Sequence, residues 1–221
     1  MGRCIHMERF RNRTEAGRSL AAALEGHDLP RPVVLGLPRG GVPVADQIAQ
    51  ALDAPLDVLV VRKLGLPSQP EVAMGAIGEQ GARVLNEDIA SNVSASELSR
   101  VERRERDELE ARVRRVRGDL PPVDLEGRTA VIVDDGIATG ATARVACLVA
   151  RARGASRIVV ATPVAAPDSL ASLEAMPEVD EVVCLSAPSG FMAVGMHYLD
   201  FSQTTDAEVQ ALLEAARASE G

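Results

Sequence analysis

The chain has 221 residues, a formal net charge of −8 and a pI near 5.0. Such an acidic balance gives no global basic field that would draw the protein to nucleic acid or to an anionic membrane. Hydrophobic residues make up 46% of the chain but aromatic residues only 2%, so the core must be built from Ala, Val, Leu and Ile. Such a core is typical of buried parallel strands and the helices that cover them.

The sequence favours a cytoplasmic protein. No run approaches the roughly 18 apolar residues of a membrane span, and the first residues, with Met7 as an alternative start, lack the apolar segment of a signal peptide. Cys4, Cys147 and Cys184 are odd in number and far apart. That pattern favours reduced thiols over a disulfide framework or a zinc site.

The predicted elements alternate between apolar strands and helices. In chain order they are helix 14–26, strand 32–38, helix 42–52, strand 56–61, a hairpin over 72–86, helix 95–117, strand 129–135, helix 143–153, strand 157–164, helix 167–176, strand 181–185 and helix 206–218. This alternation predicts an α/β fold: a doubly wound, mostly parallel five-stranded sheet with helices on both faces. We expect one domain over 1–221, with its core at about 30–186.

The charged helix 95–117 interrupts this alternation. It carries eight Arg and six acidic residues, many at i,i+3 or i,i+4 spacing, beside a thin apolar stripe. The interleaved acids favour a solvated face or a dimer contact over a nucleic-acid surface. We therefore treat residues 94–118 as a charged helical insertion in the domain.

The most specific motif is AVIVDDGIATGATA, residues 130–143. An apolar strand delivers Asp134 and Asp135, and a Gly/Thr-rich loop then opens directly into a helix. Ligands of open α/β sheets bind at this edge, and the N–H groups at a helix start favour an anion. The 5-phosphate of a sugar phosphate would be held by Ala138, Thr139, Gly140, Ala141 and Thr142.

The two acids need a different partner from the phosphate. Vicinal hydroxyls or a divalent cation would suit Asp134 and Asp135, so the motif implies ribose 5-phosphate with its 2′ and 3′ hydroxyls on these carboxylates. A dinucleotide loop is a poor fit because G-x-G-x-x-G is absent. A Walker A loop is also a poor fit because no G-K-[ST] follows the glycines.

At Val131–Thr142 the sequence resembles the type I phosphoribosyltransferases, whose signature is an apolar run, two acids, two variable residues, a small residue, then TG and T. The resemblance implies a sheet with a small hood. It also implies transfer of a phosphoribosyl group from phosphoribosyl pyrophosphate (PRPP) to a nitrogen nucleophile, usually a base. Mg²⁺ would be held by PRPP and, through water, by Asp134 and Asp135, with no direct protein ligand.

The resemblance also implies a pyrophosphate site. LGLPRGGVPVA, residues 35–45, is placed like the family's pyrophosphate loop, so Arg39, Gly40 and Gly41 are candidates to bind that group. Lys63 follows the predicted strand 56–61, where the family often has Arg-Lys, and is the chain's only lysine. Residues 64–81 correspond loosely to the family's mobile loop. The catalytic candidates are therefore Asp134, Asp135 and Lys63.

The acceptor base would be recognised by the hood, expected at about 187–205 together with the N-terminal segment. Three of the four aromatic residues, Phe191, Tyr198 and Phe201, gather there. Phe191 or Tyr198 is the candidate stacking platform, and the alternative is that these rings only fill the gap between hood and sheet. Family members acting on 6-oxopurines carry an aspartate where this chain has Ala138, which argues against such an acceptor.

The favoured interpretation is a Mg²⁺-dependent phosphoribosyltransferase acting on PRPP and a small-molecule acceptor, as a homodimer. The alternative is a non-enzymatic regulator of the same fold that senses PRPP or a nucleotide and binds RNA, DNA or a protein. The arginines of helix 95–117 are its best argument.

Overall fold

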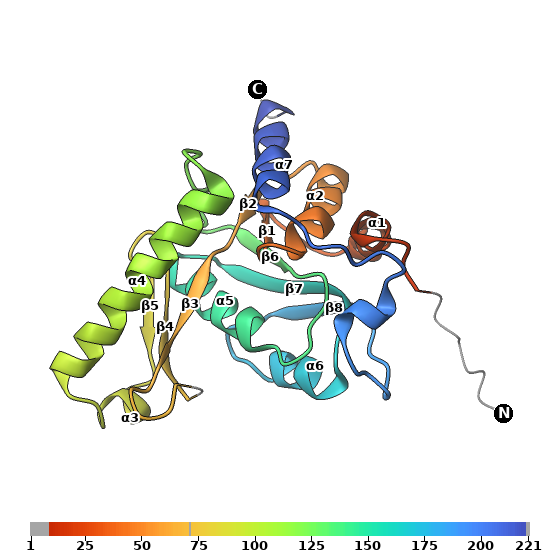
Figure 1. Ribbon diagram of the computed structural model, residues 1–221. Helices are drawn as coiled ribbons and strands as arrows, with labels where there is room; N and C mark the ends of the chain where they lie inside the picture. The colour runs from red at the N-terminus through yellow and green to blue at the C-terminus, as the bar shows by residue number, and fades with distance from the viewer. Residues whose placement is uncertain (1–8, 71, 220–221) are drawn as a thin grey trace.

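The computed structural model describes residues 9–70 and 72–219, so the predictions for Cys4 and Met7 lie outside it. Five strands form a parallel sheet in the order β2-β1-β6-β7-β8 (Figure 1). They are β1 (Pro32–Gly36), β2 (Leu56–Val58), β6 (Thr129–Val133), β7 (Arg157–Val164) and β8 (Glu181–Ser186). This arrangement confirms the predicted five-stranded parallel sheet.

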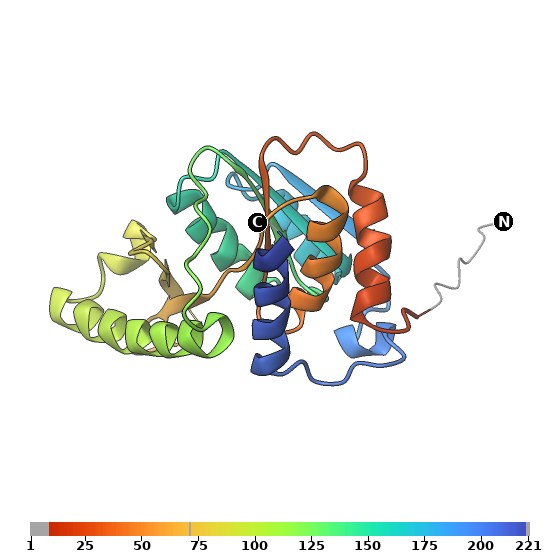
Figure 2. The ribbon, with the colours of Figure 1, turned by 90° about the horizontal axis from the view of Figure 1, so that it is seen from above.

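Helices cover both faces of the sheet, as predicted (Figures 1 and 2). One face carries α1 (Arg13–Leu24), α2 (Gly41–Leu52) and α7 (Asp206–Ser219), and the other carries α5 (Ala141–Ala152) and α6 (Pro167–Glu174). Successive residues of a strand serve opposite faces: Val131 belongs to the core under α1 and α2, and Ile132 to the core under α5. This two-sided burial explains why the strands read as continuous apolar runs.

A second lobe lies beside the sheet. Its antiparallel strands β3 (Val61–Gly65), β4 (Ala73–Gly78) and β5 (Arg83–Leu85) confirm the predicted hairpin over 72–86. After a short α3 (Glu87–Ala90), the long helix α4 (Ala95–Arg117) packs on this sheet and extends away from α1 (Figure 2). The segment 64–81, which the sequence analysis compares with the family's mobile loop, contains the end of β3 and all of β4.

The predicted strand 56–61 is wrong in its extent. β2 ends at Val58, and the chain then leaves the parallel sheet, so that Val61–Gly65 pairs with β4. Lys63 therefore stands opposite Ala76 inside the second sheet and not at the end of a parallel strand. The apolar run is continuous because Leu59 and Val60, which connect β2 to β3, are also buried, and this hides the break from a sequence pattern.

A buried ion-pair network joins the lobe to the sheet. Arg117, at the end of α4, donates to Asp57 of β2 (Nε to Oδ1, 2.9 Å) and to the Val58 carbonyl (2.8 Å). It also pairs with Glu79 of the β4–β5 turn. The other carboxylate oxygen of Asp57 accepts from Val123 N, 2.8 Å away. The points where the chain enters and leaves the lobe are thus held at one buried arginine.

The hood segment 187–205 contains a short 3-10 helix, η1 (Val194–His197), and pairs with the start of the chain. Phe10 N donates to His197 O (2.9 Å), and Leu199 N donates to Phe10 O (2.8 Å). Phe10 thereby joins the aromatic residues of the hood. None of the helices in the described residues has the length and apolar character that a membrane crossing requires.

Candidate active site

Asp134 and Asp135 follow β6 at the carboxyl end of the parallel sheet, between the loop after β1 and the start of α5. Asp135 N donates to Asp134 Oδ1, 2.9 Å away, which holds the Asp134 carboxylate against the backbone of its neighbour. Both residues are only partly exposed. The pair is therefore held at the sheet edge where a ligand would meet it.

Hydrogen bonds to the end of β7 and the start of α6 hold the loop after the acid pair. Ile137 N donates to Val164 O and Ala166 N donates to Ile137 O, each at 2.8 Å, while Ser169 Oγ donates to Ala138 O at 2.6 Å. Gly140 then takes φ +70° before α5 begins, a conformation that favours glycine. Four residues around it are exposed and open to an anion: Ala138, Thr139, Ala141 and Thr142.

Like charges meet at the acid pair. Burial, followed by the neighbouring Asp135 carboxylate, raises the pKa of Asp134 well above its ordinary value. Bound hydroxyl donors or a cation would offset this repulsion. The raised pKa favours the neutral form of Asp134, and strongly perturbed carboxyl groups of this kind cluster at functional sites.

The Asp134→Asn variant is expected to be more stable than the parent near pH 8. A carboxyl with a raised folded pKa binds more protons in the folded state, so its contribution to stability falls as pH rises from the unfolded value, about 3.9, through the folded one. Thermal unfolding should show the gain shrinking towards about pH 4. Asp107→Asn, on the exposed face of α4, is the control, and a gain that does not depend on pH would contradict this assignment.

The loop after β1 packs directly on the acid pair. A methyl group on Gly40 would overlap the Asp135 carboxylate, and one on Gly41 would overlap Val133 O. The Pro38–Arg39 peptide bond is cis. Arg39 lies 3.6 Å from Asp206 at the start of α7 (Nη1 to Oδ1). The structure thus brings together the two loops to which the sequence assigned pyrophosphate and ribose phosphate.

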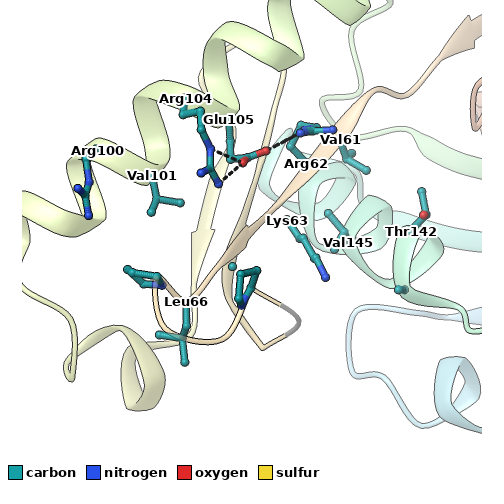
Figure 3. Close-up of a pocket in the computed structure, with 14 residues that line it drawn as sticks. Val61, Arg62, Lys63, Leu66, Arg100, Val101, Arg104, Glu105, Thr142 and Val145 are labelled. Atoms are coloured by element: carbon teal, nitrogen blue, oxygen red, sulfur yellow. Dashed lines mark hydrogen bonds and ion pairs between the residues drawn. The ribbon is translucent and has the colours of Figure 1, made fainter.

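Lys63 shares a cleft of about 780 Å³ with Thr142. The cleft lies between β3, α4 and the first turn of α5, and Figure 3 shows Lys63 and Thr142 on opposite sides of it. Its wall also carries Arg62, Arg104 and Glu105, whose carboxylate lies 2.7 Å from Arg62 Nη2 and 2.8 Å from Arg104 Nη2. Lys63 therefore lies on the side of this cleft that the second lobe forms, facing the first turn of α5.

The two candidate stacking residues have different surroundings. Tyr198 is buried, with its ring 5.7 Å from that of Phe10 and 5.1 Å from that of Phe201, and its hydroxyl donates to Asp135 O at 2.6 Å. That position favours packing over base stacking. Phe191 is partly exposed and lies parallel to the His197 ring at 5.6 Å, which leaves it as the candidate platform.

Sequence reasoning missed Arg13. Its Nε donates to Asp135 Oδ2 at 2.7 Å, its Nη1 donates to Ser202 O at 2.7 Å, and its guanidinium lies 4.1 Å from the Phe201 ring centre. Arg13 and Tyr198 therefore both tie Asp135 to the hood. No local signal marks an arginine at the start of a surface helix as the partner of a residue 122 positions away.

Together these features define a class of protein: an α/β domain whose sheet edge brings together an acid pair, a Gly/Thr-rich loop at a helix start and a second glycine-containing loop. The described residues contain no group of three or more His, Cys, Asp or Glu side chains that could hold a metal ion.

The comparisons agree with this class. The family model described as the phosphoribosyl transferase domain matches residues 7–183. Proteins of two Mycobacterium tuberculosis strains, CDC 1551 and H37Rv, each named "Putative phosphoribosyl transferase", are 53% identical over 212 residues. The match covers 95% of this chain and 47% of each relative, so the chain spans about half their length.

Solved structures give the same result. TT1426 from Thermus thermophilus is 48% identical, with a TM-score of 0.84 over 93% of this chain and 97% of that one. AQ2163 from Aquifex aeolicus, at 16% identity, has a TM-score of 0.50 over 92% of this chain and 85% of its own, and shares the fold. The chain belongs to the phosphoribosyl transferase domain family.

Proposed function

We propose that this chain transfers the 5-phosphoribosyl group of PRPP to a nitrogen nucleophile, with release of pyrophosphate. The observation that carries the proposal is the contact of Gly40 with Asp135. It places the candidate pyrophosphate loop against the carboxylate assigned to the ribose hydroxyls. PRPP carries these groups on adjacent carbons, so a site that binds it needs both loops side by side.

Each part of the site has a role in this reaction. The exposed residues around Gly140 hold the 5-phosphate at the start of α5. Asp134 and Asp135 accept hydrogen bonds from the ribose hydroxyls and stabilise positive charge that develops on the sugar as the bond to pyrophosphate breaks. Arg39, Gly40 and Gly41, together with Lys63 of the second lobe, would hold the leaving pyrophosphate. Charge stabilisation and positioning thus account for catalysis.

The residues present fit Mg²⁺ held largely by the substrate. This ion prefers oxygen ligands and keeps several waters, using one or two carboxylates together with substrate phosphates. Asp134 and Asp135 offer such carboxylates, and positive charge beside them would offset the burial and the carboxylate repulsion that raise the pKa of Asp134. When bound, Mg²⁺ supplies charge neutralisation of the pyrophosphate.

For the acceptor we propose a nucleobase other than a 6-oxopurine. The side chain of Ala138 has no proton-accepting group, and Phe191 provides a partly exposed ring beside η1. Val194 of η1 packs on Gly136, since a methyl group on that glycine would overlap its side chain. The hood thus lies directly above the sugar-binding edge, where an acceptor base would enter.

Titration calorimetry with PRPP and Mg²⁺, followed by assays of pyrophosphate release with a panel of bases, tests the proposal. Saturable PRPP binding with pyrophosphate release in the presence of one base supports the enzyme. Binding without release for any base would favour the PRPP-sensing regulator. No binding at millimolar PRPP would reject both functions.

A further inference from the structure

The charged helix α4 reaches the candidate pyrophosphate loop through Arg112. The Nη2 group of Arg112 donates to Pro38 O at 2.9 Å, across 74 positions of sequence. Pro38 begins the loop that contains Arg39 and Gly40. The second lobe therefore contacts the candidate pyrophosphate loop through Arg112.

Cations outnumber anions around this contact. Burial lowers the pKa of Arg112, and the nearby guanidinium groups of Arg39 and Arg62, with Arg115, lower it further, while Asp206 opposes them. Asp206 also faces Arg39, and the Glu105 carboxylate is shared by Arg62 and Arg104. The two carboxylates are thus outnumbered by five guanidinium groups, those of Arg39, Arg62, Arg104, Arg112 and Arg115, an arrangement that favours an added polyanion.

We propose that Arg112, with Arg39 and Arg62, forms part of the binding site for the pyrophosphate group of PRPP. The proposal rests on the proposed function and assigns a role to α4. Guanidinium groups suit this ligand because each presents several N–H donors in a planar fork that matches phosphate oxygens. The ligand brings the negative charge that the cluster lacks, and α4 becomes a wall of the active site.

A purely mechanical role for Arg112 makes a different prediction. If the side chain only held Pro38 in place, Arg112→Lys and Arg112→Gln would behave alike, since both shorten the side chain and both keep an N–H donor. If it binds pyrophosphate, the retained charge matters. The two variants therefore separate anion binding from loop positioning.

The experiment is titration calorimetry of the full chain with pyrophosphate and, separately, with ribose 5-phosphate, both with Mg²⁺. Pyrophosphate affinity should fall in the order parent, Arg112→Lys, Arg112→Gln, with the Gln variant roughly tenfold or more weaker. Ribose 5-phosphate affinity should stay within about twofold, because Arg112 bonds to the loop after β1, whereas the 5-phosphate is assigned to the loop that opens α5. Arg114→Gln, whose side chain is 70% exposed on the same helix, should match the parent.

Several results would overturn the proposal. Parental pyrophosphate affinity in Arg112→Gln would reject it while leaving the proposed function intact, and so would equal losses in the Lys and Gln variants. Equal weakening of both ligands would show that Arg112 only supports the fold, which thermal unfolding of each variant would also reveal. A parent protein that binds neither ligand would reject the proposed function as well.

Discussion

Replacing Asp135 by Asn is expected to lower the rate of phosphoribosyl transfer by roughly tenfold to a hundredfold or more. Charge-assisted hydrogen bonds contribute about 1.5–3 kcal/mol each, and each 1.36 kcal/mol is about tenfold in rate. The variant keeps the size of the side chain but loses the charge that would stabilise the developing positive sugar. Steady-state pyrophosphate release, with the acceptor that the panel of bases identifies, measures the effect.

Two controls make the Asp135 result interpretable. Arg13 lies 2.7 Å from this carboxylate, so thermal unfolding must show that the variant still folds around the unpaired guanidinium. Asp107→Asn changes the net charge equally on an exposed part of α4 and should keep the parental rate. An Asp135→Asn variant that turns over at the parental rate would remove Asp135 from the mechanism.

Replacing Arg117 by Met is expected to lower the free energy of unfolding by about 3–5 kcal/mol. Arg117 is 3% exposed and is paired with Asp57 and Glu79, which are 1% and 9% exposed. Met fills much of the volume but leaves two carboxylates buried without their cation. Equilibrium unfolding in urea measures the loss.

Arg114→Met is the matched control on the same helix. Its side chain is 70% exposed, with Glu110 at 4.0 Å, so the change in unfolding free energy should stay within about 0.5 kcal/mol. If Arg117→Met cost less than about 1 kcal/mol, the network would not be what joins the second lobe to the sheet.

The sequence predicted what depends on local pattern. Helix 95–117 has the bounds of α4 because Ser94 and Glu97 form a capping box at its start and Gly118 takes φ +63° at its end. The acid pair and the loop through Thr142 were found because strand, loop and helix start are contiguous in the chain. These signals lie within a few residues of the structure they specify.

What the sequence did not reveal depends on residues far apart in the chain. The bonds from Arg13 to Asp135 and from Arg112 to Pro38 span 122 and 74 positions, and neither arginine differs locally from its neighbours. The break after Val58 was missed because the second sheet takes up the same apolar run. Tertiary packing, which no local pattern contains, decides all three.

The position of Tyr198 gives the protein an internal optical reporter. The chain has one tyrosine and no tryptophan, and burial keeps the pKa of this phenol far above its ordinary value, so the hydroxyl stays a donor to Asp135 O. Tyrosine emission therefore comes from a single ring bonded to the backbone of the acid pair. Ligand binding that shifts the hood or Asp135 can be followed in the unlabelled protein by its own fluorescence.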